Sequence, residues 1–378
     1  MFPVSDIHPH LAAVSGLQAL LEQAVQTGVV PGLAVSAHRQ GTRMICTAGS
    51  LSTAPESKPV GAETLYDLAS LTKALCTTTL CMQAVAQQRM ALHDPVQRHL
   101  PAVKDGAITV AHLLSHSAGF PAHREFYREA IGELHRDAAA TPFSAESIVR
   151  QCCVEARVYP PGEKSLYSDI GFILLGALLQ EVLQDGLAAL FEQRIAGPLG
   201  LPTLGFRPLP SPHAALPDIA PTELCPVRQR PIVSEVHDLN AWVMGGVAGH
   251  AGLFGTAGDV RAVAEALIDS YHGAVTPLQT PATVVRQFFA NAGVPGSTWG
   301  LGWDHPSPGF SLAGTIISRA AVGHLGFTGV SLWLDPEEQA SVTMLSNRVH
   351  PHVIDDPRFR ALRPAVNDAA LRAVGHPA

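Results

Sequence analysis

The stretch YDLASLTKALCTTTLCM, residues 66–82, decides how the rest of the sequence is interpreted. Lys73 is one of only four lysines in the 378-residue chain, and no other charged residue occurs between Asp67 and Arg89. A helix that is apolar or neutral all round is usually buried, and lysine is seldom buried unless it is paired. The pattern therefore predicts a buried lysine that shares one face of a helix with Ser70, three residues earlier.

A serine and a buried lysine at this spacing suit nucleophilic catalysis. Desolvation lowers the pKa of a buried lysine, and a neutral amine can take the proton of a serine that attacks a carbonyl. We predict that Asp67 is the N-cap of this helix, so that Ser70 lies in the first turn, where free backbone N–H groups stabilise an oxyanion. The competing interpretation is a chance S-x-x-K spacing in which Lys73 extends to solvent.

Composition indicates a globular chain with a large core. Hydrophobic residues make up 47% of the sequence and charged residues 15%, which excludes general disorder. The net charge is −7 and no basic stripe occurs, so we expect neither nucleic acid nor a membrane as partner. Residues 1–16 show no signal-peptide pattern, and the longest apolar run, residues 170–179, is too short to cross a bilayer. We expect a cytoplasmic protein with six free cysteines, and the sequence leaves its oligomeric state open.

Strands are expected at both ends of the chain, with helices between them. Residues 31–38 and 42–49 predict one hairpin, and residues 330–335 and 340–347 predict another whose alternation suits a sheet with one face on a core. Helices are expected to end near Val25 and to cover residues 358–374. We therefore expect an α/β domain from residues 1–75 and 255–378, a mainly helical domain from residues 76–254, and an active site between them. Eight prolines in residues 201–232 predict a long ordered loop.

Three motifs, in this order along the chain, resemble those of the serine β-lactamase and penicillin-binding protein superfamily, most closely its class C-like branch with the family VIII carboxylesterases. LASLTKAL (residues 68–75) matches S-x-x-K, and PPGEKSLYSDIGFILLG (160–176) matches the PGE…Y-x-N segment, with Tyr167 as the tyrosine. VGHLGFTGVSLWLDP (322–336) places His324-Leu325-Gly326 where K-T-G is found. Supporting segments are ITVAHLLSHSAGFP (108–121) and GHAGLFGTAGDV (249–260). The motifs together are far more specific than any one of them.

The resemblance implies an α+β fold of the β-lactamase/transpeptidase type, with an antiparallel sheet flanked by helices and a mainly helical region. It implies that Ser70 is the acylated nucleophile and that Lys73 and Tyr167 share the general-base and general-acid roles. It also implies an oxyanion hole formed by the backbone N–H groups of Ser70 and Phe327. No metal and no organic cofactor are implied.

The sequence departs from the β-lactamase pattern where the substrate is expected. Asp169 replaces the asparagine of Y-x-N, His324 replaces the lysine of K-T-G, and Leu325 replaces its hydroxyl residue. Together with Gly326 and Trp303, these form the predicted substrate-binding set. A largely uncharged histidine and an added negative charge should hold a carboxylate-bearing β-lactam poorly. We therefore predict a carboxylesterase that cleaves small, uncharged, short-chain esters.

Other functions stay open at this point. A β-lactamase, DD-peptidase, D-aminopeptidase or acyltransferase would use the same catalytic residues, and a non-catalytic sensor or scaffold would share the fold. His112 and His116, four residues apart, have the spacing of half a zinc site, but capping or packing is the expected role because no third ligand is evident. We expect His237 and His250 to approach the pocket, and Trp299 to lie in a pocket wall or in the core.

Overall fold

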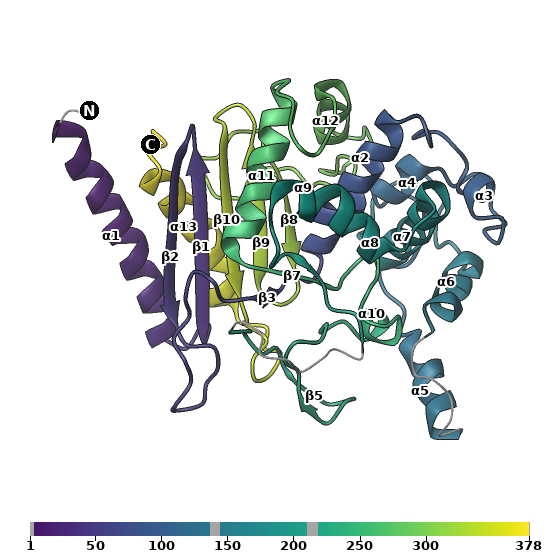
Figure 1. Ribbon diagram of the computed structural model, residues 1–378, viewed down its shortest axis with the longest axis horizontal. Coiled ribbons are helices and arrows are strands. Elements are labelled where there is room, and N and C mark those ends of the chain that lie inside the picture. The colour runs from purple at the N-terminus through teal and green to yellow at the C-terminus, as the bar shows by residue number, and fades with distance from the viewer. Residues whose placement is uncertain (1–3, 137–143, 210–217, 378) are drawn as a thin grey trace.

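The central sheet draws its strands from both ends of the chain (Figure 1). The computed structural model describes residues 4–136, 144–209 and 218–377. Five antiparallel strands lie in the order β2–β1–β10–β9–β8. Their bounds confirm the two predicted hairpins: β1 (Gly32–Arg39), β2 (Thr42–Gly49), β8 (Val322–Gly326), β9 (Val330–Asp335) and β10 (Ala340–Ser346).

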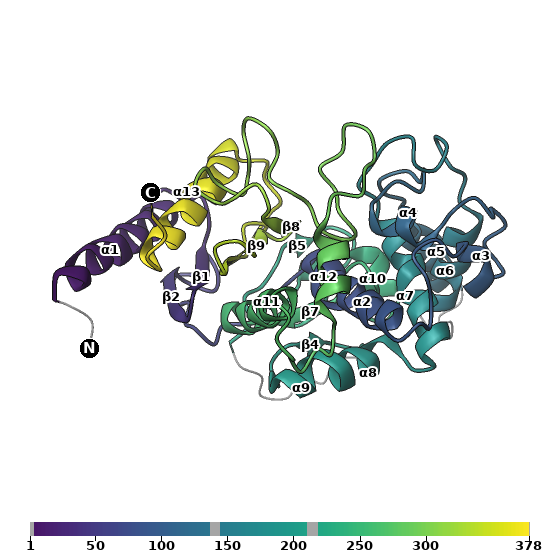
Figure 2. The same cartoon turned by 90° about the horizontal axis from the view of Figure 1, so that it is seen from above.

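Helices cover both faces of this sheet (Figure 2). The terminal helices α1 (Val4–Gln26) and α13 (Pro357–Ala373) confirm the two predicted helices. They pack together on one face of the sheet, and α11 (Ala257–Tyr271) lies on the other. Met344 belongs to the core beneath α13, whereas the adjacent Leu345 belongs to the core on the α11 side. The alternation in β9 predicts one face on a core, but both faces are buried, because the alternating side chains serve two separate cores.

The middle of the chain is mainly helical, as the sequence predicts (Figure 1). A π-helical segment, Lys73–Thr78, leads directly into α2 (Thr79–Ala86). The other helices of this region are short, apart from one long buried helix, and their bounds are α3 (Val96–His99), α4 (Val110–Leu114), α5 (Tyr127–Arg136), α6 (Ala145–Val154), α7 (Asp169–Leu183), α8 (Leu187–Phe191), a π-helical turn (Glu192–Ala196), α9 (Gly197–Leu199), α10 (Leu239–Val243) and, later in the chain, α12 (Ala282–Phe289).

The proline-rich segment follows the surface of the molecule and contributes three short strands, as expected of an ordered loop. These are β4 (Gly205–Phe206), which forms a small sheet with β3 (Tyr66–Asp67) and β7 (Leu253–Gly255), and the pair β5 (Leu224–Cys225) and β6 (Arg230–Pro231). Hydrogen bonds from Leu65 to Asp218 and from Ala220 to Leu65 join the segment to the body. The predicted loop also includes Pro210, Pro212 and Pro217, which lie outside the described residues.

Within the described ranges, no individual helix has the length and apolarity needed to span a membrane. Among the described residues, one pair of helical segments, Asp169–Leu183 and Leu187–Leu199, passes that test when taken together, with a bend of 77° between the two. Helix α7 is largely buried inside the protein, which explains its apolar sequence. All six cysteines are buried free thiols.

Candidate active site

Ser70 lies at the end of a tight turn that connects β3 to the following helix. Ala69 has a left-handed backbone with φ of 45°, and the helical hydrogen bonds begin with Leu71. The carboxylate of Asp67 accepts hydrogen bonds from Ala69 N at 2.8 Å and from His237 N at 2.6 Å. The prediction that Asp67 caps the helix is therefore wrong: its side chain fixes the turn and the neighbouring loop instead. Ser70 immediately precedes the helix.

The side chain of Lys73 is completely buried, which confirms that prediction. Its Nζ donates to Ser70 Oγ at 2.9 Å, to Asp169 Oδ1 at 2.8 Å and to the backbone oxygen of His250 at 3.0 Å. A lysine ammonium group has three N–H donors, and here each has an acceptor. The geometry is that of a protonated lysine whose charge is compensated by Asp169.

The ion pair with Asp169 shows that the predicted neutral state of Lys73 is wrong. Burial lowers the pKa of Lys73, as the sequence suggests, but the charges and hydrogen bonds of Asp169 and Tyr167 outweigh it and raise that pKa to about 12. Burial alone would raise the pKa of Asp169, yet the Lys73 ammonium and the hydrogen bond from His123 hold it below its usual value. The carboxylate at the Y-x-N position is therefore neutralised by Lys73 and does not act as the free repelling charge that we expected.

Tyr167 lies just before α7 and completes a group of three with Ser70 and Lys73. Lys73 Nζ lies 5.0 Å from the centroid of its ring. Burial raises the pKa of Tyr167, and the nearby Lys73 ammonium acts in the opposite direction. The phenol ring packs against His116 with a centroid separation of 4.6 Å and against Trp299 at 5.7 Å. The three residues predicted from separate motifs thus meet at one point.

His116 holds the chain on both sides of Tyr167. Its Nδ1 accepts from Ser168 N at 3.1 Å, and its backbone oxygen accepts from Leu166 N at 2.9 Å. His112 instead accepts the N–H of Thr109 in a capping box at the start of α4. The two histidines therefore have capping and packing roles, as expected, and among the described residues no group of three or more metal-binding side chains occurs.

His324 adjoins the same aromatic group from strand β8. Its ring centroid is 5.9 Å from that of Tyr167, and its Nδ1 donates to the backbone oxygen of Leu325 at 2.8 Å. Burial, with the Lys73 charge, lowers the pKa of His324 to about 3. This histidine is therefore neutral where the superfamily pattern has a lysine, as the sequence predicts.

The end of β8 packs against the turn that carries Ser70. A Cβ atom on Gly326 would lie 3.0 Å from Leu68 O and 3.3 Å from the Cβ of Ala69, so only glycine fits without displacement. Thr328 Oγ1 donates to the backbone oxygen of Asp67 at 2.8 Å. In the part of the chain that the structure describes, the backbone N–H groups of Ser70 and Phe327 donate to no protein acceptor. Both are available to a ligand oxygen.

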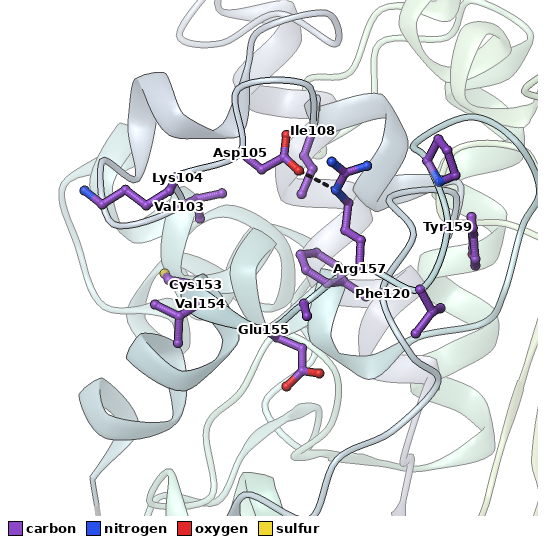
Figure 3. A pocket seen from close by; sticks show the side chains of 13 residues that line it. Val103, Lys104, Asp105, Ile108, Phe120, Cys153, Val154, Glu155, Arg157 and Tyr159 are labelled. Atoms are coloured by element: carbon purple, nitrogen blue, oxygen red, sulfur yellow. Dashed lines mark ion pairs between the residues drawn. The ribbon is translucent and has the colours of Figure 1, made fainter.

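A cavity of about 420 Å³ opens beside these residues, and Ser70, Tyr167, Asp169 and Phe327 line it. His237 and His250 also line it, as the sequence predicts. A larger cavity of about 620 Å³ lies elsewhere, between residues 103–108 and 153–160 (Figure 3). An ion pair of Arg157 with Asp105 joins its two sides, and it shares no lining residue with the first cavity. The smaller cavity is the candidate active site because it contains the Ser70 group.

Comparison with known proteins agrees with this geometry. The chain matches the Beta-lactamase family over residues 17–367. It belongs to the Beta-lactamase family. The putative D-alanyl-D-alanine carboxypeptidase of Escherichia coli K12 is 30% identical over 319 residues, covering 77% of this chain and 71% of that protein. The predicted superfamily, which is one of serine hydrolases, is therefore confirmed.

Solved structures confirm the predicted fold of this Beta-lactamase family member. The hydrolase EstCE1, described as having promiscuous acyltransferase activity, has a TM-score of 0.70 at 24% identity and covers 96% of this chain and 99% of its own. Simvastatin synthase (LovD) from Aspergillus terreus has a TM-score of 0.73 at 18% identity, over 97% and 99% of the two chains. At these identities the likeness concerns the fold alone.

Of the predicted substrate-binding set, Asp169 alone lines the cavity. His324 is buried beside Tyr167 and Gly326 packs on the Ser70 turn, while Trp303 and Leu325 lie farther away. Trp303 is fully buried in the core and packs edge-on against Phe289 at 5.4 Å. Leu325 packs against the core beneath α13, because alternation along β8 directs it to the face opposite to that of His324. Trp299, and not Trp303, packs beside Tyr167, with ring centroids 5.7 Å apart.

The structure adds cavity residues that the sequence did not single out. His123 donates from Nδ1 to Asp169 Oδ2 at 3.1 Å, and Glu125, Glu223 and Asp238 also line the cavity. His123 follows the quoted segment 108–121 and Asp238 follows the noted His237, so proximity in sequence was the available signal. It could not show that these segments converge on one cavity.

Proposed function

We propose that this Beta-lactamase family member cleaves short-chain esters without a carboxylate group, through an acyl-enzyme on Ser70. The contact that carries the proposal is Lys73 Nζ donating to Ser70 Oγ at 2.9 Å, with the ring centroid of Tyr167 5.0 Å from the same Nζ. A serine hydroxyl becomes a nucleophile when a neighbouring base can accept its proton. The candidate base adjoins the hydroxyl directly.

Tyr167 is the group we propose to take the serine proton. The three N–H groups of Lys73 point to acceptors, so Lys73 cannot accept a proton until it has lost one. A phenolate at Tyr167, stabilised by the adjacent ammonium, removes the proton of Ser70 as its oxygen bonds to the ester carbonyl carbon. Tyr167 then protonates the departing alcohol, and the same pair activates the water that releases the acid.

The oxyanion of each tetrahedral intermediate is proposed to bind the backbone N–H groups of Ser70 and Phe327. Both amides are free of protein acceptors in the described residues, and the close packing of Gly326 on the Ser70 turn brings the two segments together. Two such donors stabilise the charge that develops in the transition state.

The preference for esters without a carboxylate rests on the charges of the cavity. None of the described residues that line it is a lysine or an arginine, and His324 is neutral where the superfamily pattern has a lysine. A carboxylate on the substrate would therefore lose its hydration without gaining a cation. Peptidase activity is the second candidate, favoured by the name of the Escherichia coli relative, although the terminal carboxylate of a D-alanyl-D-alanine peptide meets the same difficulty.

Competing assays on the purified protein test the proposal. We expect a higher kcat/KM for nitrophenyl butyrate than for the β-lactam nitrocefin, and no measurable release of D-alanine from a D-alanyl-D-alanine peptide. Substitution of Ser70 by alanine should abolish ester cleavage. Faster turnover of nitrocefin or of the peptide, or an active Ser70→Ala variant, would overturn the proposal.

A further inference from the structure

A buried arginine contacts the peptide group that supplies one of the two proposed oxyanion donors. Arg363, in α13, is only 6% exposed, and its Nη2 donates to the backbone oxygen of Gly326 at 3.2 Å. That oxygen and the N–H of Phe327 belong to the same peptide group, at the end of β8. Phe327 lines the cavity beside Ser70 and Arg363 does not. The arginine therefore acts from outside the cavity on a group that faces the substrate.

Arg363 has no acidic partner in the described part of the chain. Burial, together with the like charge of Arg348, lowers the pKa of Arg363 to about 9, so the side chain is still protonated at neutral pH. Both guanidinium groups lie against the ring of Phe359, at 5.1 Å for Arg363 and 5.3 Å for Arg348. Arginine is seldom buried unless it is paired, and an uncompensated buried charge lowers stability. Packing alone would be served better by an apolar side chain.

The direction of the peptide group determines what this contact does. The bond between Gly326 and Phe327 is trans, so its C=O and N–H point in opposite directions. A charged donor at the oxygen draws electron density from the nitrogen, and hydrogen bonds in a chain strengthen one another by about 10–30% in this way. The N–H of Gly329 also donates to Gly326 O at 3.2 Å. The turn thus orients the peptide group, and what Arg363 adds is its positive charge.

We propose that Arg363 is a positioning residue of the oxyanion hole, and that its charge polarises the Gly326–Phe327 peptide group and strengthens the Phe327 N–H as a donor. This inference rests on the proposed acyl-enzyme chemistry at Ser70 and adds to it a residue that touches no substrate. The stabilisation grows with the charge on the bound oxygen, so it favours the transition state over the uncharged ester. Acylation and deacylation both pass through an oxyanion, so loss of Arg363 should slow both and leave KM nearly unchanged.

Arg363→Met removes the charge and the donor. Methionine adapts to the space of the longer side chain and is a good helix former. We expect kcat for nitrophenyl butyrate to fall by about three- to tenfold, a fraction of the loss of about a hundred- to a thousandfold that follows removal of a whole oxyanion-hole donor. The thermal midpoint should stay the same or rise, because the variant no longer buries an unpaired charge. Arg360→Met removes an exposed charge from the same helix and is the matched control, with wild-type kcat expected.

Two further substitutions separate charge from packing. Arg363→Lys keeps a positive charge with N–H donors, whereas Arg363→Gln keeps neutral N–H donors alone. If polarisation is the role of residue 363, kcat decreases in the order arginine, lysine, glutamine, methionine. The lysine and glutamine variants decide the question even if Arg363→Met fails to fold. A lysine variant no faster than the glutamine variant would assign the contact to packing and overturn the inference.

The affinity for a trifluoromethyl ketone measures the oxyanion hole without turnover. Ser70 Oγ bonds to the ketone carbon, the serine proton passes to Tyr167, and the carbonyl oxygen becomes an oxyanion at the Ser70 and Phe327 N–H groups. In Arg363→Met the inhibition constant should rise by about the factor by which kcat falls, and in Arg360→Met it should stay at the wild-type value. A change in packing alone would not link the two quantities.

The outcomes separate this inference from the proposed function. Wild-type kcat in a folded Arg363→Met variant would overturn the role of Arg363, and so would a fall in kcat with an unchanged inhibition constant. Failure of the wild-type protein to cleave the ester, or cleavage that does not depend on Ser70, would instead overturn the acyl-enzyme chemistry on which the inference rests.

Discussion

Lys73 Nζ lies 2.8 Å from Asp169 Oδ1, and this buried ion pair sets the protonation of the Ser70 group. The side chain of Lys73 has no exposed surface and that of Asp169 is 17% exposed, so solvent screens the pair little. An S-x-x-K lysine surrounded by neutral groups would lose its proton easily because of burial. In this chain the aspartate at the Y-x-N position holds the proton on Lys73, and the site begins its reaction with both Lys73 and Tyr167 protonated.

The pH dependence of ester cleavage should reflect this pair. The pKa of Lys73 is raised to about 12 and that of Tyr167 is also raised, so one proton must leave the pair before a base exists. We predict that kcat/KM for nitrophenyl butyrate increases with pH and is still increasing at about pH 9. A stopped-flow profile corrected for hydroxide-catalysed hydrolysis measures it. A plateau reached below neutral pH would contradict the assignment.

Asp169→Asn should shift this profile to lower pH. The substitution removes the negative charge that favours the protonated pair, so burial again lowers the pKa of Lys73 and the first proton leaves more easily. We expect the acid limb to move by about one pH unit or more. Asp185→Asn provides the control for loss of a carboxylate at an exposed site. An acid limb in Asp169→Asn that coincides with that of the wild type would show that Asp169 does not set the protonation.

Tyr167→Phe separates the hydroxyl from the ring. The ring contacts with His116 and Trp299 remain, so the free energy of unfolding should change by no more than about 1 kcal/mol. Loss of the proposed general base should reduce kcat by about one hundred- to ten-thousand-fold. Thermal denaturation and steady-state kinetics measure the two effects. A variant with wild-type kcat would remove Tyr167 from the mechanism.

Gly326→Ala tests the packing of β8 on the Ser70 turn. The added methyl group would meet a Val330 methyl at 2.3 Å and Leu68 O at 3.0 Å, so β8 must shift away from the turn. We expect kcat to fall about a hundredfold as the two N–H groups separate, and the free energy of unfolding to fall by about 1–3 kcal/mol. Gly61→Ala is the matched control, because nothing lies within 4 Å of its added carbon. Equal effects of the two substitutions would contradict the proposed role of β8.

The two tryptophans in the segment 298–304 should respond differently to substitution by phenylalanine. Trp303→Phe leaves space in the core, so the free energy of unfolding should fall by about 1–3 kcal/mol while KM is retained. Trp299→Phe alters a half-buried residue that contacts Tyr167 and His116, so kcat should change more than stability. A reversed pattern would return Trp303 to the substrate-binding set.

Much of the fold could be predicted because local patterns and the ordered motifs agree. The hairpins β1–β2 and β9–β10 have alternating apolar residues, and both terminal helices have clear ends. These patterns predict one sheet that is built from both ends of the chain. The same patterns did not predict that helices cover both faces of the sheet. Alternation shows that successive side chains point in opposite directions, but it does not show that α11, distant in sequence, covers the second face.

The sequence predicted which residues of each motif belong to the site, but it did not predict the interactions between residues of different motifs. Ser70, Lys73 and Tyr167 were located from their motifs, but the state of Lys73 depends on a partner 96 residues away. The sequence shows Asp169 at the Y-x-N position without showing which way its carboxylate points. Trp303 was misplaced for a similar reason, since two tryptophans in one short segment cannot be assigned to core and cavity without the packing around them.

The most direct test of the account is to locate the covalent adduct. The purified protein is treated with a fluorophosphonate probe, digested, and analysed by peptide mass spectrometry, with Ser70→Ala in parallel. The account predicts one adduct per chain, on the peptide containing Ser70, formed in proportion to the loss of esterase activity and absent in the variant. Inactivation with the adduct on another residue, or full esterase activity in Ser70→Ala, would contradict it.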